Sequence, residues 1–243
     1  MKKFRRVAEV LGIALLIYVC SAWIASREPN EKIWLHRCNS IEKYHEKNKQ
    51  FSNVEVDIIY RGNGIFDVTH DADTSFYLKI DPYLKEIGDN DNKIWLDIKN
   101  VSDSNCVEMC ASLERLCRKY GVDKEQLIIE GGNWKALRIF TENDFYTSYY
   151  VHFPAPQKLE EEEIEQYVDS LEYIAATHSV DALSFPGWWY RDIKDNLNSS
   201  IDLLTWMHRN TKWEFYMRPI HFRMMDDPQL KVVLIKSKGD YHR

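Results

Sequence analysis

The stretch from Val54 to Asp71 constrains the fold of this chain more than any other. In its first part, Val54–Tyr60, apolar and acidic residues alternate with a period of two, which predicts a β-strand with two distinct faces. Glu55 and Asp57 then point to the same side, about 7 Å apart along the strand. The strand ends in the unbroken apolar run Ile58–Tyr60, which favours burial on both faces, as in a parallel sheet.

Two carboxylates on a strand buried on both faces need a partner, because an unpaired buried charge is very costly. A divalent cation is the simplest such partner, whereas a strand whose acidic face meets water would need none. After this strand, Arg61–Gly64 turns the chain, and a second short strand is expected to return His70 toward Glu55 and Asp57. The stretch therefore predicts a hairpin that brings a histidine to a carboxylate pair.

The first 26 residues have the composition of a targeting segment. Four basic residues precede an apolar run from Val10 to Ala25, which is just shorter than the roughly 17–25 residues of a spanning helix. We expect residues 1–26 to be a signal anchor, slightly favoured, or a cleaved signal peptide. A linker at 27–32 and one domain at 33–243 follow. The basic residues place that domain outside the cytoplasm, either anchored in the membrane or, after cleavage, secreted or periplasmic.

Charge and composition narrow the possible functions. A formal net charge of -6 gives no support for nucleic-acid binding. A hydrophobic content of 44%, with only nine Gly and seven Pro, indicates a folded globular chain. Cys106, Cys110 and Cys117 lack the spacing of a zinc site, so we interpret them as buried, small apolar side chains of one helix.

Short apolar strands alternate with helices along the rest of the chain. Such alternation implies parallel pairing, and about eight strands in one domain of this size predict a closed (β/α)8 TIM-type barrel. The strands are expected at 33–37, 54–60, 93–99, 126–130, 145–151, 181–185, 212–217 and 231–235. Helices are expected at 40–49, 104–120, 134–140 and 159–177, and in a polar stretch that ends with Ser200–His208.

Polar residues stand at the ends of consecutive expected strands. In a parallel barrel the strand ends meet at the C-terminal mouth, where the chemistry of such barrels is found. These residues should therefore converge on one cavity with the acidic pair of the 54–60 strand. Taken singly, each residue could be a satisfied surface group, but their joint position favours a site. The set comprises His36, Arg37, Asp97, Lys99 and Glu130.

In order and approximate spacing, four motifs of this chain resemble those of glycerophosphodiester phosphodiesterases, which belong to the superfamily of phospholipase C-like phosphodiesterases. The motifs are His36-Arg37, Glu55-x-Asp57, His70-Asp71 and Asp97-x-Lys99, and they cover roughly residues 33 to 99. The runs Trp34-x-His36, Asn39-Ser40 and Leu96–Lys99 also resemble the menorin group of that superfamily. The resemblance implies a metal-dependent barrel enzyme that hydrolyses a glycerophosphodiester-type or related phosphodiester bond, in a small molecule or a lipid headgroup.

The resemblance also implies a role for each matched residue. His36 and His70 would be the acid/base pair, and Arg37 and Lys99 would bind the substrate phosphate. The metal ligands would be Glu55, Asp57 and Asp97. Glu130 is a possible additional site residue because of its strand-end position alone. Independently of the resemblance, oxygen ligands suit Mg²⁺ or Ca²⁺, and histidine titrates near neutral pH.

The chain departs from the phosphodiesterase motifs at several positions. Cys38 stands where glycine is usual, and Asp97 replaces the usual glutamate, which shortens that ligand arm by one methylene. The C-terminal third has no Thr-Asp-x-Pro after its last strand. These differences bear on substrate identity and keep an alternative open, a catalytically weak, menorin-like barrel that acts as an extracytoplasmic binding module. The two histidines His36 and His70 favour the enzyme, because a binding module needs neither.

Overall fold

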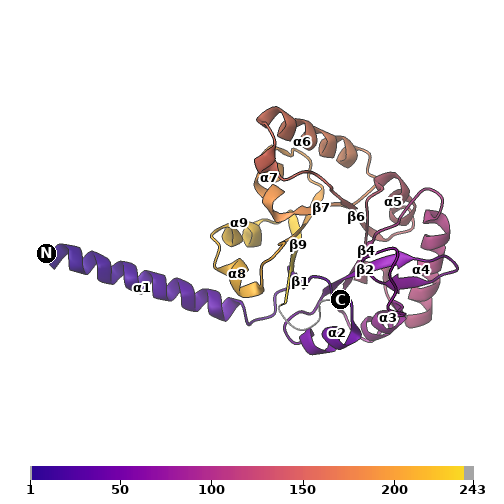
Figure 1. Cartoon of the computed structure of the whole chain (residues 1–243), viewed down its shortest axis with the longest axis horizontal. Coiled ribbons are helices and arrows are strands. Elements are labelled where there is room, and N and C mark those ends of the chain that lie inside the picture. The colour runs from indigo at the N-terminus through magenta and orange to yellow at the C-terminus, as the bar shows by residue number, and fades with distance from the viewer. Residues whose placement is uncertain (1, 238–243) are drawn as a thin grey trace.

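Eight parallel strands form a closed barrel in the computed structural model, which describes residues 2–237 (Figure 1). Around the barrel each strand pairs with the next, and the first pairs with both the second and the last, which closes the ring. The predicted TIM-type barrel is thereby confirmed; residues 238–243 of the predicted domain lie outside the described residues. In chain order the strands are β1 (Ile33–Leu35), β2 (Val54–Tyr60), β4 (Ile94–Ile98), β5 (Leu127–Gly131), β6 (Tyr146–Tyr150), β7 (Ala182–Pro186), β8 (Asp202–Trp206) and β9 (Leu230–Ile235).

A ninth short strand, β3 (Phe66–Val68), lies antiparallel to β2 and makes the predicted hairpin. The turn between them passes through Gly62 and Gly64, whose φ angles of 82° and 77° lie in the left-handed region that glycine tolerates best. Beyond β3 the Thr69 N–H donates to the Asp57 carbonyl at 3.1 Å. The returning strand therefore stays beside β2 up to the residue that precedes His70.

The seam between β1 and β2 is the narrowest pairing of the barrel. Only Leu35 and Val54 are in register across it, whereas β1 matches β9 at three positions. Two further backbone bonds support the seam: the Leu35 N–H donates to the Asn53 carbonyl at 3.0 Å, and the Cys38 N–H donates to the Glu55 carbonyl at 2.8 Å. The barrel is thus closed by few backbone contacts at this point.

Helices cover the outside of the barrel (Figure 1). The predicted helix cap at Ser40 is present, because its side chain accepts from the Lys43 N–H. The predicted cysteines are buried on the helix Cys106–Tyr120, and none forms a disulfide among the described residues. The helices are α2 (Ile41–Lys47), α3 (Asp81–Gly88), α4 (Cys106–Tyr120), α5 (Trp134–Thr141), α6 (Glu161–Ala176), α7 (Tyr190–Asn196), α8 (Lys212–Tyr216) and α9 (Ile220–Asp226), with short 3-10 turns at Lys124–Gln126, Pro156–Lys158 and Gly187–Trp189.

A first helix, α1 (Lys2–Ala25), extends away from the barrel (Figure 1). Its segment Phe4–Ala25 has a mean hydropathy of 2.1 and is long and apolar enough to cross a membrane. Membrane anchors and signal sequences share this length and composition. Its last turns touch the barrel domain, where the Tyr18 hydroxyl donates to the Tyr216 carbonyl of α8 at 3.2 Å and Ala22 is buried.

The interior of the barrel is a packed apolar core. Large side chains alternate along the strands with residues that face the covering helices, as the period of two requires. Side chains fill the interior of such a barrel, so it is a packed core and not a pore. The interior cluster consists of Trp34, Trp95, Ile128, Ala182, Leu204, Trp206, Val232 and Leu234.

Two predicted elements are wrong, and both lie between residues 200 and 217. Ser200–His208 was expected to be helical but contains the strand β8, because a strand buried on both faces has the same continuous apolar composition as a buried helix. The range 212–217 was expected to be a strand but forms the helix α8. A capping box of Thr211 and Glu214 starts that helix. The two errors cancel in the strand count, so the barrel prediction was unaffected.

Candidate active site

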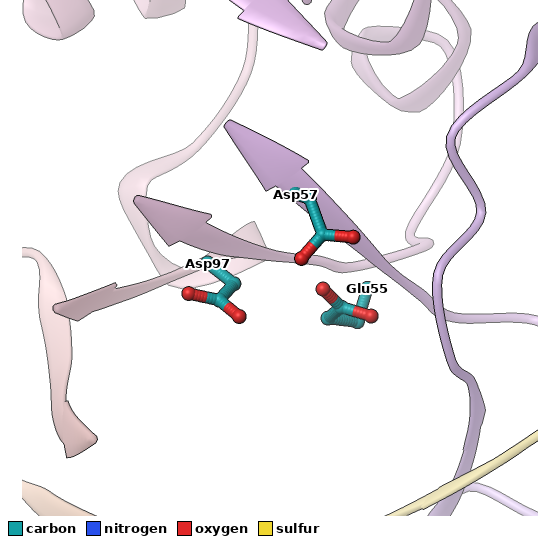
Figure 2. A group of neighbouring side chains, drawn as sticks. All are labelled: Glu55, Asp57 and Asp97. Atoms are coloured by element: carbon teal, nitrogen blue, oxygen red, sulfur yellow. The ribbon is translucent and has the colours of Figure 1, made fainter. Parts of the chain in front are cut away.

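Three carboxylates meet where β2 and β4 approach the mouth of the barrel (Figure 2). Glu55 and Asp57 lie on β2, and Asp97 lies on β4 in register with Asp57. One oxygen of each residue lies within 4.8 Å of one oxygen of each of the others. All residues of β2 are buried, as the apolar run in its sequence predicted. The strand lies between β1 and β4 in the barrel.

Lys99 is the main counter-charge of this cluster. Its Nζ lies 2.7 Å from Asp57 Oδ1 and also contacts Asp97 Oδ2. Burial alone would raise the pKa of Asp57, but Lys99 and a hydrogen bond from Asn39 hold it below its ordinary value. Burial raises the pKa of Asp97 in spite of Lys99. Lys99 therefore keeps Asp57 ionised but does not fully offset the effect of burial on Asp97.

Glu55 is the least compensated of the three acids. Burial, together with the charges of Asp57 and Asp97, raises its pKa well above the ordinary value. Its Oε1 is buried and has no hydrogen-bond partner among the described residues. A divalent cation would neutralise this excess negative charge and occupy the unpartnered oxygen. The donor set fits Mg²⁺ or Ca²⁺, because both prefer carboxylate oxygens.

His36 and Arg37 follow β1 and face the carboxylates from the other side of the seam. His36 Nε2 lies 3.8 Å from Glu55 Oε2, and burial lowers the pKa of His36 well below its ordinary value. Arg37 has a left-handed φ of 53°, which turns its N–H to Glu55 Oε2 at 2.5 Å. Its guanidinium stays half exposed, with Nε 3.8 Å from Asp57 Oδ2. The buried imidazole is thus neutral near pH 7, beside an accessible cation.

His70 lies at the exposed rim of the same site. The pairing of Thr69 with Asp57 carries it there, and its Nδ1 lies 2.6 Å from Asp71 Oδ1. Among the charges that act on Asp97, His70 opposes the effect of burial and lowers its pKa. The two predicted histidines therefore differ in environment, since 12% of the His36 side chain is exposed and 42% of the His70 side chain.

Glu130 is held just below the carboxylate cluster. It is in register with Asp97 on β5, and it is buried. The Trp95 indole N–H donates to its Oε2 at 2.5 Å, and the Ser184 hydroxyl donates to its Oε1. Burial, followed by the charge of Asp97, raises the pKa of Glu130 well above its ordinary value. Both oxygens are already used, so Glu130 supports the site without belonging to the group of three.

Two residues that support the site were not predicted from the sequence. Asn39 binds Asp57 twice: its Nδ2 donates to Asp57 Oδ2 at 2.7 Å, and its Oδ1 accepts from the Asp57 N–H at 3.0 Å. The buried Lys43 donates to the Arg37 carbonyl at 2.5 Å and so holds the turn after β1. No periodicity marks either residue. Cys38, the departure from glycine, is fully buried away from the mouth, and burial raises its pKa to about 12.

The fold is that of known phosphodiesterases. No protein-family model matches the sequence, and no curated protein is significantly similar to it. Among solved structures, the chain resembles a glycerophosphodiester phosphodiesterase from Parabacteroides distasonis, with a TM-score of 0.57 and 13% identity over 84% of this chain and 92% of that one. It also resembles a phosphodiesterase from Oleispira antarctica in complex with its product sn-glycerol-3-phosphate, with a TM-score of 0.52 and 14% identity over the same shares.

A third similar structure is that of an enzyme with a different reaction. A U32 peptidase has a TM-score of 0.50 and 10% identity, over 87% of this chain and 94% of the peptidase. Identities this low establish the barrel fold, and one fold supports many reactions. What this chain does must therefore be argued from its own side chains.

Proposed function

We propose that this protein is a metal-dependent phosphodiesterase that hydrolyses a glycerophosphodiester-type bond. The observation that carries the proposal is the grouping of Glu55, Asp57 and Asp97 with Lys99 at the mouth of the barrel. The similarity of the fold to glycerophosphodiester phosphodiesterases supports it. The binding-module alternative gains no support from these comparisons.

The three carboxylates would hold the cation, Mg²⁺ or Ca²⁺, through one oxygen each. When bound, the cation supplies positive charge to a non-bridging phosphate oxygen and so favours attack at phosphorus. Lys99 stays beside Asp57 and Asp97 and offers its remaining N–H donors to the phosphate. Arg37 contributes an exposed guanidinium, whose planar donors match two phosphate oxygens.

His36 and His70 would move the protons. The buried His36 is neutral and accepts the proton of the attacking hydroxyl, which belongs either to water or to the substrate. His70 sits at the rim, where it exchanges protons with solvent, and it protonates the departing alcohol oxygen. Attack by water yields an alcohol and a phosphate monoester. Attack by a substrate hydroxyl releases the alcohol and leaves a cyclic phosphodiester, which water then opens to the monoester. Glu130, held by Trp95 and Ser184, keeps β5 in place beneath Asp97.

The decisive experiment is a hydrolysis assay on purified full-length protein in detergent. A panel of glycerophosphodiesters with choline, ethanolamine and glycerol headgroups is incubated with Mg²⁺, with Ca²⁺ or with EDTA. We expect metal-dependent release of the headgroup alcohol. Metal binding without hydrolysis of any panel member would instead favour the binding module.

The apolar helix supports a proposal for location. We infer that α1 anchors the protein in a membrane with the barrel on the extracytoplasmic side, because the basic residues precede the apolar run. The substrate is then a small phosphodiester or a lipid headgroup outside the cytoplasm. Carbonate extraction tests this: an anchored protein stays in the pellet. A soluble protein whose N-terminus maps near Trp23 would show that the segment is cleaved.

A further inference from the structure

The alternation of side chains inside the barrel brings an unassigned lysine to the candidate site. Trp34, Leu234 and Trp206 are in register on the adjacent strands β1, β9 and β8, and all three belong to the interior cluster. Two residues further along, just beyond the ends of β1 and β9, stand His36 and Lys236 on the same face, while His208 lies in the turn after β8.

Backbone pairing continues beyond the strand ends and keeps Lys236 beside His36. The His36 N–H donates to the Ile235 carbonyl at 2.9 Å, and the Met207 N–H donates to the Leu234 carbonyl at 2.9 Å. The Lys236 N–H donates to the Asn210 carbonyl at 3.0 Å, which ties the loop after β8 to the end of β9. Lys236 therefore lies between His36 and the loop that carries His208 and Arg209.

The charges around Lys236 belong to the candidate site. Burial lowers the pKa of Lys236, and Arg37 lowers it further, while Asp57 and Glu55 act in the opposite direction. The pKa of His208 is likewise lowered by burial and then by Lys236, Arg209 and Arg37. Within residues 2–237, no carboxylate lies within ion-pair distance of either Lys236 or Arg209.

Lys236 and Arg209 add more positive charge to the site than one phosphodiester would neutralise. The three carboxylates, Lys99, Arg37 and one divalent cation together leave a single positive charge. A phosphodiester carries one negative charge and neutralises it. Lys236 and Arg209 then remain as two further cations at the same mouth, without a carboxylate partner within residues 2–237. Unpaired cations near a partly buried site are favourable when a bound anion compensates them.

We propose that Lys236, with Arg209 and His208, forms a second anion subsite that binds a phosphate or carboxylate group on the same substrate. This inference rests on the proposed function, because it assumes that the phosphodiester lies at the carboxylate cluster. The preferred substrate then carries a second negative charge a few bonds from the scissile phosphate. Lys236 and His36 directly follow the paired residues Ile235 and Leu35, so the second anion and the scissile phosphate would bind at the same part of the mouth.

Calorimetric titration of the full-length protein in detergent, with excess Mg²⁺, tests the subsite without requiring turnover. The probes are sn-glycerol-3-phosphate, glycerol 1,3-bisphosphate and 3-phosphoglycerate, which differ in the presence of a second phosphate or a carboxylate. We expect at least one of the two probes with a second acidic group to bind about 10-fold more tightly than sn-glycerol-3-phosphate. The probe with the larger gain identifies the preferred group.

Variants separate the subsite from the rest of the site. Lys236→Met should abolish the gain and leave the affinity for sn-glycerol-3-phosphate within about 2-fold, and Lys236→Arg should retain it. Lys231→Met is the matched control, because Lys231 lies near the start of β9, at the end of the strand opposite to Lys236. Equal affinities for all probes, or a gain that survives in Lys236→Met, would overturn the subsite alone. Failure of the wild type to bind any probe would overturn the phosphate site and the subsite together.

Discussion

Replacement of Lys99 by methionine tests the electrostatics of the candidate site through stability and not through turnover. Lys99 Nζ lies 2.7 Å from Asp57 Oδ1 and contacts Asp97, and its pKa is raised by these two acids despite burial. Lys99→Met removes the main counter-charge of the buried acids, and breaking a buried ion pair in this way typically costs roughly 3–5 kcal/mol. In EDTA we expect a loss of about 3 kcal/mol, or a melting temperature lower by roughly 6–12 °C for a domain of this size.

The same variant tests whether the carboxylates hold a cation. A divalent cation supplies the counter-charge that the methionine lacks, so excess Mg²⁺ or Ca²⁺ should raise the melting temperature of Lys99→Met more than that of the wild type. Turnover should stay low, because a donor to the phosphate is lost.

The measurement is thermal unfolding followed by circular dichroism, in EDTA and in metal. Lys231→Met is the control, because Lys231 forms an exposed pair with Asp202 at 3.4 Å and should change stability by less than about 1 kcal/mol. A Lys99→Met variant that melts within about 2 °C of the wild type in EDTA would refute the charge balance described here. Equal melting with and without metal would refute the cation site.

Three further predictions concern the other site residues. His36→Ala and His70→Ala should each lower kcat at least about 100-fold with an unchanged circular dichroism spectrum, whereas the exposed His45→Ala should not. Asp57→Asn should weaken metal affinity in calorimetry, and excess metal should partly restore activity; full activity at low metal would contradict its role as a ligand. In metal-free protein, burial and the neighbouring acids raise the pKa of Glu55 well above its ordinary 4.5. The folded protein therefore holds this proton more tightly than the unfolded chain, so stability falls as the pH rises above 4.5. Glu55→Gln should therefore flatten the decline of stability from pH 5 to 8 in denaturant titrations with EDTA, and an unchanged slope would contradict the assignment.

The parts of the fold that the sequence predicted correctly are those with a local cause. The alternation and the apolar run of Val54–Tyr60 predicted a buried strand, and the glycines of the turn after it predicted the hairpin that carries His70. The grouping of the carboxylates followed from the barrel, because parallel strand ends meet at one mouth. The errors at β8 and α8 arose where burial removed the periodic signal.

The supporting residues could not be predicted because their roles depend on the tertiary structure. Asn39 and Lys43 act through hydrogen bonds to Asp57 and to the Arg37 carbonyl, which exist only once the turn after β1 has formed. Lys236 is a single lysine after a strand, and its position depends on the register of β9 with β1. Register is a property of the whole barrel and leaves no mark in a local pattern.

Because the seam between β1 and β2 is narrow, a residue of the candidate site also helps to close the barrel. In place of a regular ladder, the Arg37 N–H binds the side chain of Glu55, while the Cys38 N–H binds its carbonyl. Any ligand that binds to Glu55 therefore also acts on the joint that closes the ring. Amide hydrogen exchange at Arg37 and Cys38 should then slow when the site is filled, because opening of the first strand and release of the ligand become one event.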